Sequence, residues 1–179
     1  FDPHRFHNEL GLNVLMPVLP LHGPRASGRM SSGDVMSPDY VNMLHFFAQA
    51  VWDIRRMLGW LRERGADQIG LWGVSMGGYT SALIAALEND LECVIAGVPP
   101  TDFCNVARDN MPWIMRTYEH EITTDWNDVR KMMYAVSPLS FDPLVPKERR
   151  FIYAGIADRV VRPDPVSYTH LTLPTIDRV

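Results

Sequence analysis

The chain has 179 residues, enough for one domain of ordinary size and hardly enough for two. Apolar residues make up 46% of it and charged residues 21%, a composition typical of a globular domain with a hydrophobic core. Lys and Arg total 17 against 21 Asp and Glu, a net charge of -4. This balance disfavours a general nucleic-acid binder, because such proteins carry a basic excess. No apolar run approaches the roughly 18 residues of a membrane-spanning helix, and two cysteines are too few for a disulfide framework or a cysteine-rich zinc site.

In the first part of the chain, the sequence predicts a strand, two loops and one long helix. Residues 12–19 are the predicted buried strand, which ends at Pro20 and runs into a loop over 21–25, and the Ser- and Gly-rich residues 28–37 are predicted as loop. The helix begins near Pro38, with Ser37 as its N-cap, and Gly65 ends it. Its apolar residues recur at alternating spacings of three and four, which predicts that one face packs on the sheet: Leu44, Phe47, Val51, Ile54, Leu58 and Leu61.

The rest of the chain alternates apolar strands with helices. Predicted strands cover residues 68–74, 91–98 and 150–154, the last followed by a turn over 155–158. A helix rich in small residues follows the first of these strands over 76–88, and residues 101–137 are predicted to be helical or irregular. This alternation predicts an α/β fold with a mostly parallel sheet flanked by helices.

Both ends of the chain depart from the pattern of a complete domain. Residue 1 is Phe and no signal peptide is present, so the start of the native protein is expected upstream, together with any targeting signal. The absence of an Asn-x-Ser/Thr site slightly favours a cytoplasmic protein over a secreted one. Residues 166–175 resemble a translated sequencing adapter, and we therefore expect native sequence to end near Pro165 and residues 166–179 to be a non-native tail.

One motif carries specific chemistry. Gly73-Val-Ser75-Met-Gly77-Gly78 stands between a predicted strand and a predicted helix, which is the context that a G-x-S-x-G nucleophile elbow requires. Its serine sits on a strained turn that lifts the hydroxyl clear of the sheet, and bulky residues at the glycine positions are expected to collide with the neighbouring strand or helix. The first N–H groups of the helix point into the same space and can stabilise an oxyanion.

The chain resembles the α/β-hydrolase superfamily, on its serine esterase, lipase and prolyl-oligopeptidase-like side. The resemblance covers about residues 12–162 and is carried by Leu21-His22-Gly23, by the elbow at Ser75, and by Gly155-Ile-Ala-Asp158-Arg-Val-Val, in the family's order. It implies an incomplete α/β-hydrolase domain over residues 1–165, with a helical, lid-like insertion at about 101–137.

The resemblance also assigns roles to the elbow and to the loop after the early strand. It makes Ser75 the nucleophile and the N–H of Met76 one oxyanion donor. The second donor is expected from Gly23, Arg25 or a neighbour, because Pro24 has no N–H. His22 is expected to organise this loop and not to act as a base, since the catalytic histidine comes last in the family's order.

Asp158 is the expected acid that orients the histidine, because it follows a strand and a glycine turn. Asp102, which follows the preceding strand, is the alternative acid. The base is missing: His4, His7, His22 and His45 come too early, His120 lies in the insertion, and His170 qualifies only if the tail is native. We therefore expect the catalytic histidine to lie outside this sequence and the 179-residue chain alone to be inactive.

Other features are less specific. Arg25 and Arg29 flank the oxyanion loop and suit a substrate carboxylate or phosphate, although ordinary ion pairs explain them as well. The insertion contains Met and aromatic residues that suit either an acyl pocket or plain core packing: Met111, Trp113, Met115, Tyr118, Trp126, Met132 and Met133. No nucleotide-binding motif or metal-ligand pattern occurs, so no cofactor is expected.

The leading hypothesis is a serine hydrolase that cleaves a small-molecule ester, thioester or amide through an acyl-enzyme on Ser75. Two alternatives stay open. The same residues serve an acyltransferase, which passes the acyl group to an acceptor other than water. A non-catalytic binding module of the same fold is the alternative from another class of protein, because fold does not fix function.

Overall fold

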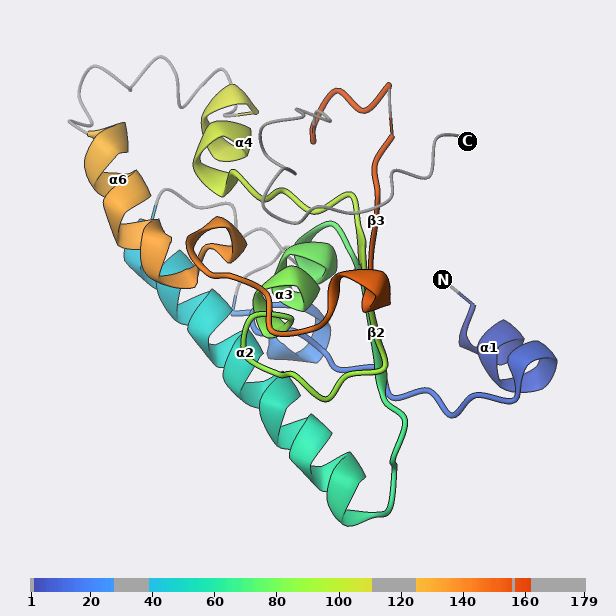
Figure 1. Ribbon diagram of the computed structural model, residues 1–179. Helices are drawn as coiled ribbons and strands as arrows, with labels where there is room; N and C mark the ends of the chain where they lie inside the picture. The colour runs from blue at the N-terminus through green and yellow to red at the C-terminus, as the bar shows by residue number, and fades with distance from the viewer. Residues whose placement is uncertain (1, 28–38, 111–124, 156, 162–179) are drawn as a thin grey trace.

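The computed structural model describes residues 2–27, 39–110, 125–155 and 157–161 (Figure 1). Three strands, β1 (Gly70–Val74), β2 (Cys93–Gly97) and β3 (Arg150–Tyr153), form one sheet in the order β1-β2-β3. Both pairings are parallel, with Gly70 opposite Cys93 and Val94 opposite Arg150. The mostly parallel sheet flanked by helices, predicted from the sequence, is therefore confirmed.

Helices lie on both sides of these strands. They are α1 (Pro3–Leu10), α2 (Tyr40–Glu63), α3 (Met76–Ile84), α4 (Phe103–Asp109) and α6 (Trp126–Met133). Four short 3₁₀ turns complete the described structure: η1 (Gly23–Arg25), η3 (Tyr134–Val136), η4 (Pro138–Ser140) and η5 (Lys147–Arg149). Figure 1 shows α2, α3 and α6 on one side of the strands and α1 on the other, where the ring of Phe6 stacks on Trp72 of β1 with 5.5 Å between centroids.

The α3 helix lies directly on the sheet and is almost entirely buried. Its small residues permit a close approach that larger side chains would prevent. An aromatic cluster joins α3 to α2 and α4. The ring centroids of Tyr79 and Phe47 lie 4.3 Å apart, and Phe47 also contacts Phe103 edge-on. The Tyr79 hydroxyl donates a 2.9 Å hydrogen bond to the carbonyl of Val136 in η3.

The long helix α2 differs from its prediction at its start and in its buried face. It begins at Tyr40, and the carboxylate of Asp39 caps it by accepting from the N–H of Asn42; Ser37 and Pro38 lie outside the described residues. Its predicted end is confirmed, since Gly65 takes a left-handed φ of 87° just after the helix. The buried face is shifted from the predicted one and consists of Met43, Phe46, Phe47, Ala50, Ile54 and Leu58.

This shift follows from what α2 packs against. Its first half contributes to the aromatic cluster with α3, α4 and α6, and only the half with Ile54 and Leu58 shares a hydrophobic cluster with strand residues, Leu71 and Val94. The prediction that one face of the helix packs on the sheet therefore holds only for this second half, because α3 packs on the strands beside the first half.

Residues 12–19 do not form the predicted strand. They have no ladder partner in the described part of the chain, and most of them are exposed, including Leu12, Leu15 and Met16. A strand exists only through hydrogen bonds to a neighbour, and an apolar run does not by itself supply that neighbour. The predicted loop over 28–37 lies outside the described residues. In the part of the chain that is described, no helix has the length and apolarity needed to cross a membrane.

The Tyr79 hydroxyl provides a test of this core. Tyr79→Phe is expected to lower the free energy of unfolding by about 1–2 kcal/mol, because the buried carbonyl of Val136 loses its donor. Urea unfolding at pH 7 measures the change, and the exposed Tyr134→Phe is the control, with an effect within about 0.5 kcal/mol.

The same pair predicts a pH dependence. Burial raises the pKa of the Tyr79 hydroxyl above its usual value near 10. Above pH 10 the unfolded chain therefore loses this proton while the folded chain keeps it, so the wild type loses stability with rising pH and Tyr79→Phe lacks this contribution. The difference in the free energy of unfolding between the wild type and Tyr79→Phe is therefore expected to narrow above pH 10. A constant difference would show that burial does not raise the pKa of the Tyr79 hydroxyl.

Candidate active site

Ser75 occupies a strained turn between β1 and α3. Its backbone has φ 54° and ψ -117°, a region that serine rarely adopts. The turn is held by a 2.8 Å hydrogen bond from the N–H of Ser75 to the carbonyl of Gly97 on β2, and the residue is exposed. Its side chain does not cap the helix. Ser75 thus lies on a strained turn at the end of a parallel strand, and its hydroxyl bonds no described residue. Its role as a nucleophile stays a prediction.

The glycines around this turn have unequal roles. A side chain at Gly73 would overlap the backbone of Gly77, and one at Gly78 would press against the backbone of Gly97. At Gly77 an added Cβ would meet no atom within 4 Å. The expectation that both glycines of the G-x-S-x-G motif are sterically required is thus wrong for Gly77, because its Cα faces open space and Gly78 makes the close approach to β2.

The first N–H of α3, that of Met76, is the predicted oxyanion donor. The N–H of Met76 has no acceptor among the described residues, whereas the N–H of Tyr79 already donates to the carbonyl of Ser75. The dipole of α3 adds to the positive potential at this end. This is the geometry expected of one oxyanion donor, and the role remains a prediction.

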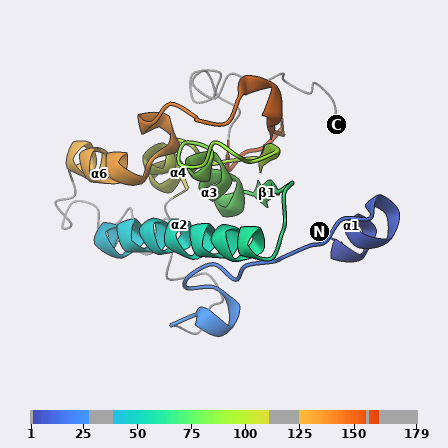
Figure 2. The ribbon, with the colours of Figure 1, turned by 60° about the horizontal axis from the view of Figure 1, so that its bottom comes forward.

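The loop with His22 and Gly23 is tied to α2 by its side chains. His22 accepts or donates at Nδ1 with the carbonyl of Pro20 at 2.8 Å, and its ring lies against Phe46. The Arg25 guanidinium bonds the carboxylate of Asp53 at 2.7 Å, and its backbone N–H donates to the carbonyl of His22. Figure 2 shows η1 on one side of α2 and α3 on the other. These contacts place His22 in the organisation of the loop and Arg25 in an ion pair with α2, and Gly23 has a left-handed φ of 49°. The second oxyanion donor, expected from Gly23, Arg25 or a neighbour, stays a prediction.

Asp158 lies in the turn after β3, with its side chain half-buried. Its N–H donates to the carbonyl of Gly155, and its Oδ1 accepts from the N–H groups of Val160 and Val161 at 2.8 and 2.9 Å. Two backbone donors fix the orientation of the carboxylate, while no described residue bonds its Oδ2. The role of Asp158 as the acid that orients a histidine stays a prediction.

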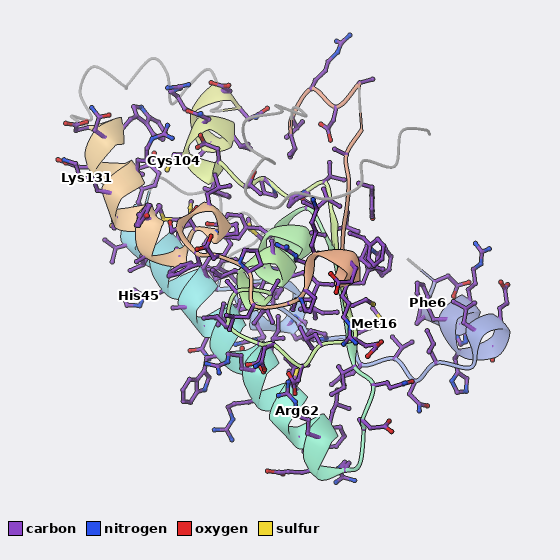
Figure 3. All side chains as sticks on the ribbon, viewed as in Figure 1. Phe6, Met16, His45, Arg62, Cys104 and Lys131 are labelled. Atoms are coloured by element: carbon purple, nitrogen blue, oxygen red, sulfur yellow. The ribbon has the colours of Figure 1, made fainter. Side chains whose placement is uncertain are left out.

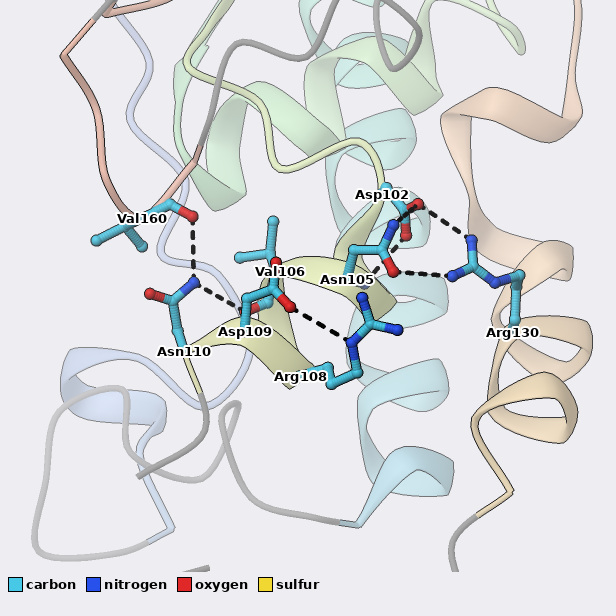
Figure 4. A network of polar contacts seen from close by, with 8 residues as sticks. All are labelled: Asp102, Asn105, Val106, Arg108, Asp109, Asn110, Arg130 and Val160. Atoms are coloured by element: carbon cyan, nitrogen blue, oxygen red, sulfur yellow. Dashed lines mark hydrogen bonds and ion pairs between the residues drawn. The ribbon is translucent and has the colours of Figure 1, made fainter. Parts of the chain in front are cut away.

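Asp102, the alternative acid, is committed to structure. Its Oδ1 caps α4 by accepting from the N–H of Asn105, and its Oδ2 accepts from the Asn105 amide and from the Arg130 guanidinium of α6 (Figure 4). Both oxygens are used, so this geometry favours Asp158 over Asp102 as the acid.

None of the described histidines is bonded to Ser75 or Asp158. His7 bonds the carbonyl of Leu12, His22 bonds Pro20, and His45 is exposed and points outward from α2 (Figure 3). His120 and His170 lie outside the described residues, as do Arg29 and the lid candidates Met111, Trp113, Met115 and Tyr118. The described members of that group, Trp126, Met132 and Met133, pack against the aromatic cluster, which is the core-packing role left open by the sequence.

A second strained residue, Val98, was not predicted from the sequence. It follows β2 with φ 44°, which is unusual for a β-branched side chain, and its N–H donates a 2.7 Å hydrogen bond to the carbonyl of Tyr153 on β3. Strained residues thus follow two neighbouring strands at the same edge of the sheet. Valine has no preference for such a turn, so its identity gave no signal.

The model of one protein family, described as the prolyl oligopeptidase family, matches residues 31–170. The chain belongs to the prolyl oligopeptidase family. This family is part of the α/β-hydrolase superfamily, so the observed sheet and helices are a partial α/β-hydrolase fold, as the resemblance implied.

Two curated proteins of Mycobacterium tuberculosis, from strains H37Rv and CDC 1551, are similar to the chain and are both named as uncharacterized proteins. Each is 43% identical over 164 residues, which is 91% of this chain and 39% of the relative. The chain therefore spans about two fifths of the length of these relatives.

The unequal glycines give a direct test of the turn. Gly73→Ala is expected to lower the free energy of unfolding by about 2–3 kcal/mol, because the new Cβ overlaps the backbone of Gly77. Gly77→Ala is the matched control, expected to equal the wild type or exceed it by up to about 1 kcal/mol, since it adds a helix-favouring residue in open space. Thermal and urea unfolding measure both, and equal losses in the two variants would show that the turn is not packed in this way.

Proposed function

We propose that the native protein is a serine hydrolase that cleaves an ester, thioester or amide bond of a small molecule through an acyl-enzyme on Ser75. The observation that carries the proposal is the strained, exposed Ser75, whose N–H is fixed to Gly97 and whose hydroxyl has no partner among the described residues. Membership of the prolyl oligopeptidase family supports serine-hydrolase chemistry.

The reaction has two steps. In the first, the Oγ of Ser75 attacks the carbonyl carbon, its proton passes to a histidine, and the N–H of Met76 and a donor near Gly23 stabilise the oxyanion. The bond to the leaving group then breaks, and the histidine returns the proton to that group. In the second step, a water molecule attacks the carbonyl carbon of the acyl-enzyme and gives a proton to the histidine. The bond between that carbon and the Oγ of Ser75 then breaks, the acid product leaves, and the histidine returns the proton to the Oγ, which restores Ser75.

The acid and the histidine complete this machinery. Neighbouring parallel strands lie about 5 Å apart, so the ends of β1 and β3, separated by β2, lie roughly 10 Å apart. Ser75 and Asp158 lie in the turns that follow these two strands, and the proposed histidine lies between the turns. We assign the acid to Asp158, through its Oδ2. We place the histidine in the native chain beyond residue 165 and regard residues 1–165 as part of the catalytic domain, with 101–137 as the insertion.

A fluorophosphonate probe tests the proposal, because it reacts only with activated serine nucleophiles. The native full-length protein is expected to be labelled, the Ser75→Ala variant to be unlabelled, and the 179-residue chain to be labelled weakly or not at all. A folded full-length protein without labelling would refute the hydrolase and support the non-catalytic binding module. If labelling occurs, product analysis with an added alcohol or amine acceptor separates hydrolysis from acyl transfer.

The two aspartates predict opposite outcomes. In the full-length protein, Asp158→Ala is expected to lower kcat for an activated ester by about 10³–10⁴-fold. Asp102→Ala is the matched variant, expected to keep kcat within a few-fold and to lower the free energy of unfolding by about 1–2 kcal/mol through the lost helix cap. Ester-hydrolysis kinetics and urea unfolding on both variants measure this, and the reverse pattern would assign the acid to Asp102.

A further inference from the structure

The end of α4 is hydrogen-bonded to the turn that carries Asp158. The side-chain nitrogen of Asn110 donates to the carbonyl of Val106 at 2.9 Å, within its own helix, and to the carbonyl of Val160 at 3.1 Å (Figure 4). The sequence separation of 50 residues makes this a tertiary contact. One amide thus joins the start of the predicted insertion to the acid turn.

The turn is held by hydrogen bonds of its own residues and by one from α4. Within the turn, the N–H groups of Val160 and Val161 donate to Asp158 Oδ1. From α4, the side-chain nitrogen of Asn110 donates to the carbonyl of Val160. The carbonyl of Val160 and the N–H of Val161 belong to one peptide group. A displacement of this group therefore moves an N–H that orients the Asp158 carboxylate.

The other end of α4 is fixed as well. Arg130 of α6 bonds the Asp102 carboxylate and the Asn105 side-chain oxygen, each at 3.0 Å. Phe103 is buried in the aromatic cluster with α2 and α3. The helix that carries Asn110 is therefore anchored to the core, which gives the Asn110 amide a defined position from which to hold the turn.

We propose that Asn110 is a positioning residue, which orients the Asp158 carboxylate by holding the carbonyl of Val160. The inference rests on the proposed function, in which Asp158 holds the catalytic histidine. Asn110 itself touches neither substrate nor reacting atoms. Its side chain acts through the turn, so its contribution exists only while Asp158 is present.

A double-mutant cycle in the full-length protein tests this dependence. Asn110→Ala is expected to lower kcat about tenfold with an unchanged KM, because the carboxylate is displaced while the substrate site is intact. In the Asp158→Ala background the same substitution is expected to have no further effect. Asn127→Ala, an exposed asparagine of α6 whose side chain bonds no described residue, is the control and is expected to leave kcat unchanged in both backgrounds.

The outcomes separate this inference from the proposed function. A wild type without serine-dependent hydrolysis refutes the proposed function itself. If the wild type is active, an equal tenfold loss in both backgrounds, an effect on KM alone, or no effect of Asn110→Ala refutes the role of Asn110. Asn110→Asp is a second variant that keeps the size of the side chain but cannot donate to the two carbonyls, and it is expected to show the same dependence on Asp158.

Discussion

The close approach of α3 to the sheet is the constraint on which the candidate site depends. The turn at Ser75 exists because Gly73 and Gly78 have no side chains, which lets the backbone of α3 contact the ends of β1 and β2. The hydrogen bond from the N–H of Ser75 to Gly97 then fixes the turn to the neighbouring strand. A backbone in this region costs on the order of 1–3 kcal/mol, and the surrounding packing of buried α3 residues offsets that cost.

The parallel sheet gathers the candidate functional residues at the edge where its strands end. Parallel strands all end on the same side, so Ser75, Val98 and the Asp158 turn follow β1, β2 and β3 at one edge although they are far apart in sequence. Each strand end is hydrogen-bonded to the next, through Ser75 to Gly97 and through Val98 to Tyr153. These two hydrogen bonds connect the end of β1 to β2 and the end of β2 to β3, which precedes the Asp158 turn. The strained backbone of Val98 donates the second of them.

The sequence predicted the local features well because local patterns determine them. The strands β1, β2 and β3, the end of α2 at Gly65 and the turn at Ser75 each depend on a few adjacent residues. The errors concern contacts between distant segments. The apolar run over 12–19 has no described partner strand. The first half of α2 buries its apolar side chains in the aromatic cluster and not against the sheet. Arg25 illustrates the same point, since only the fold brings it to Asp53, 28 residues away.

Ion pairs lie near the other edge of the sheet, where the strands begin. Arg55 and Arg62 near the end of α2 bond Glu88 at 2.6 and 2.8 Å, and Arg62 also bonds Asp90 just before β2. Isolated surface ion pairs contribute little, but here the shared Glu88 carboxylate is largely buried and links two elements that precede β1 and β2. Ion pairs thus join the segments that precede β1 and β2, whereas Ser75 and Val98, two residues with left-handed φ, follow the same two strands. The strained geometry that the proposed chemistry at Ser75 requires is therefore confined to the ends of the strands.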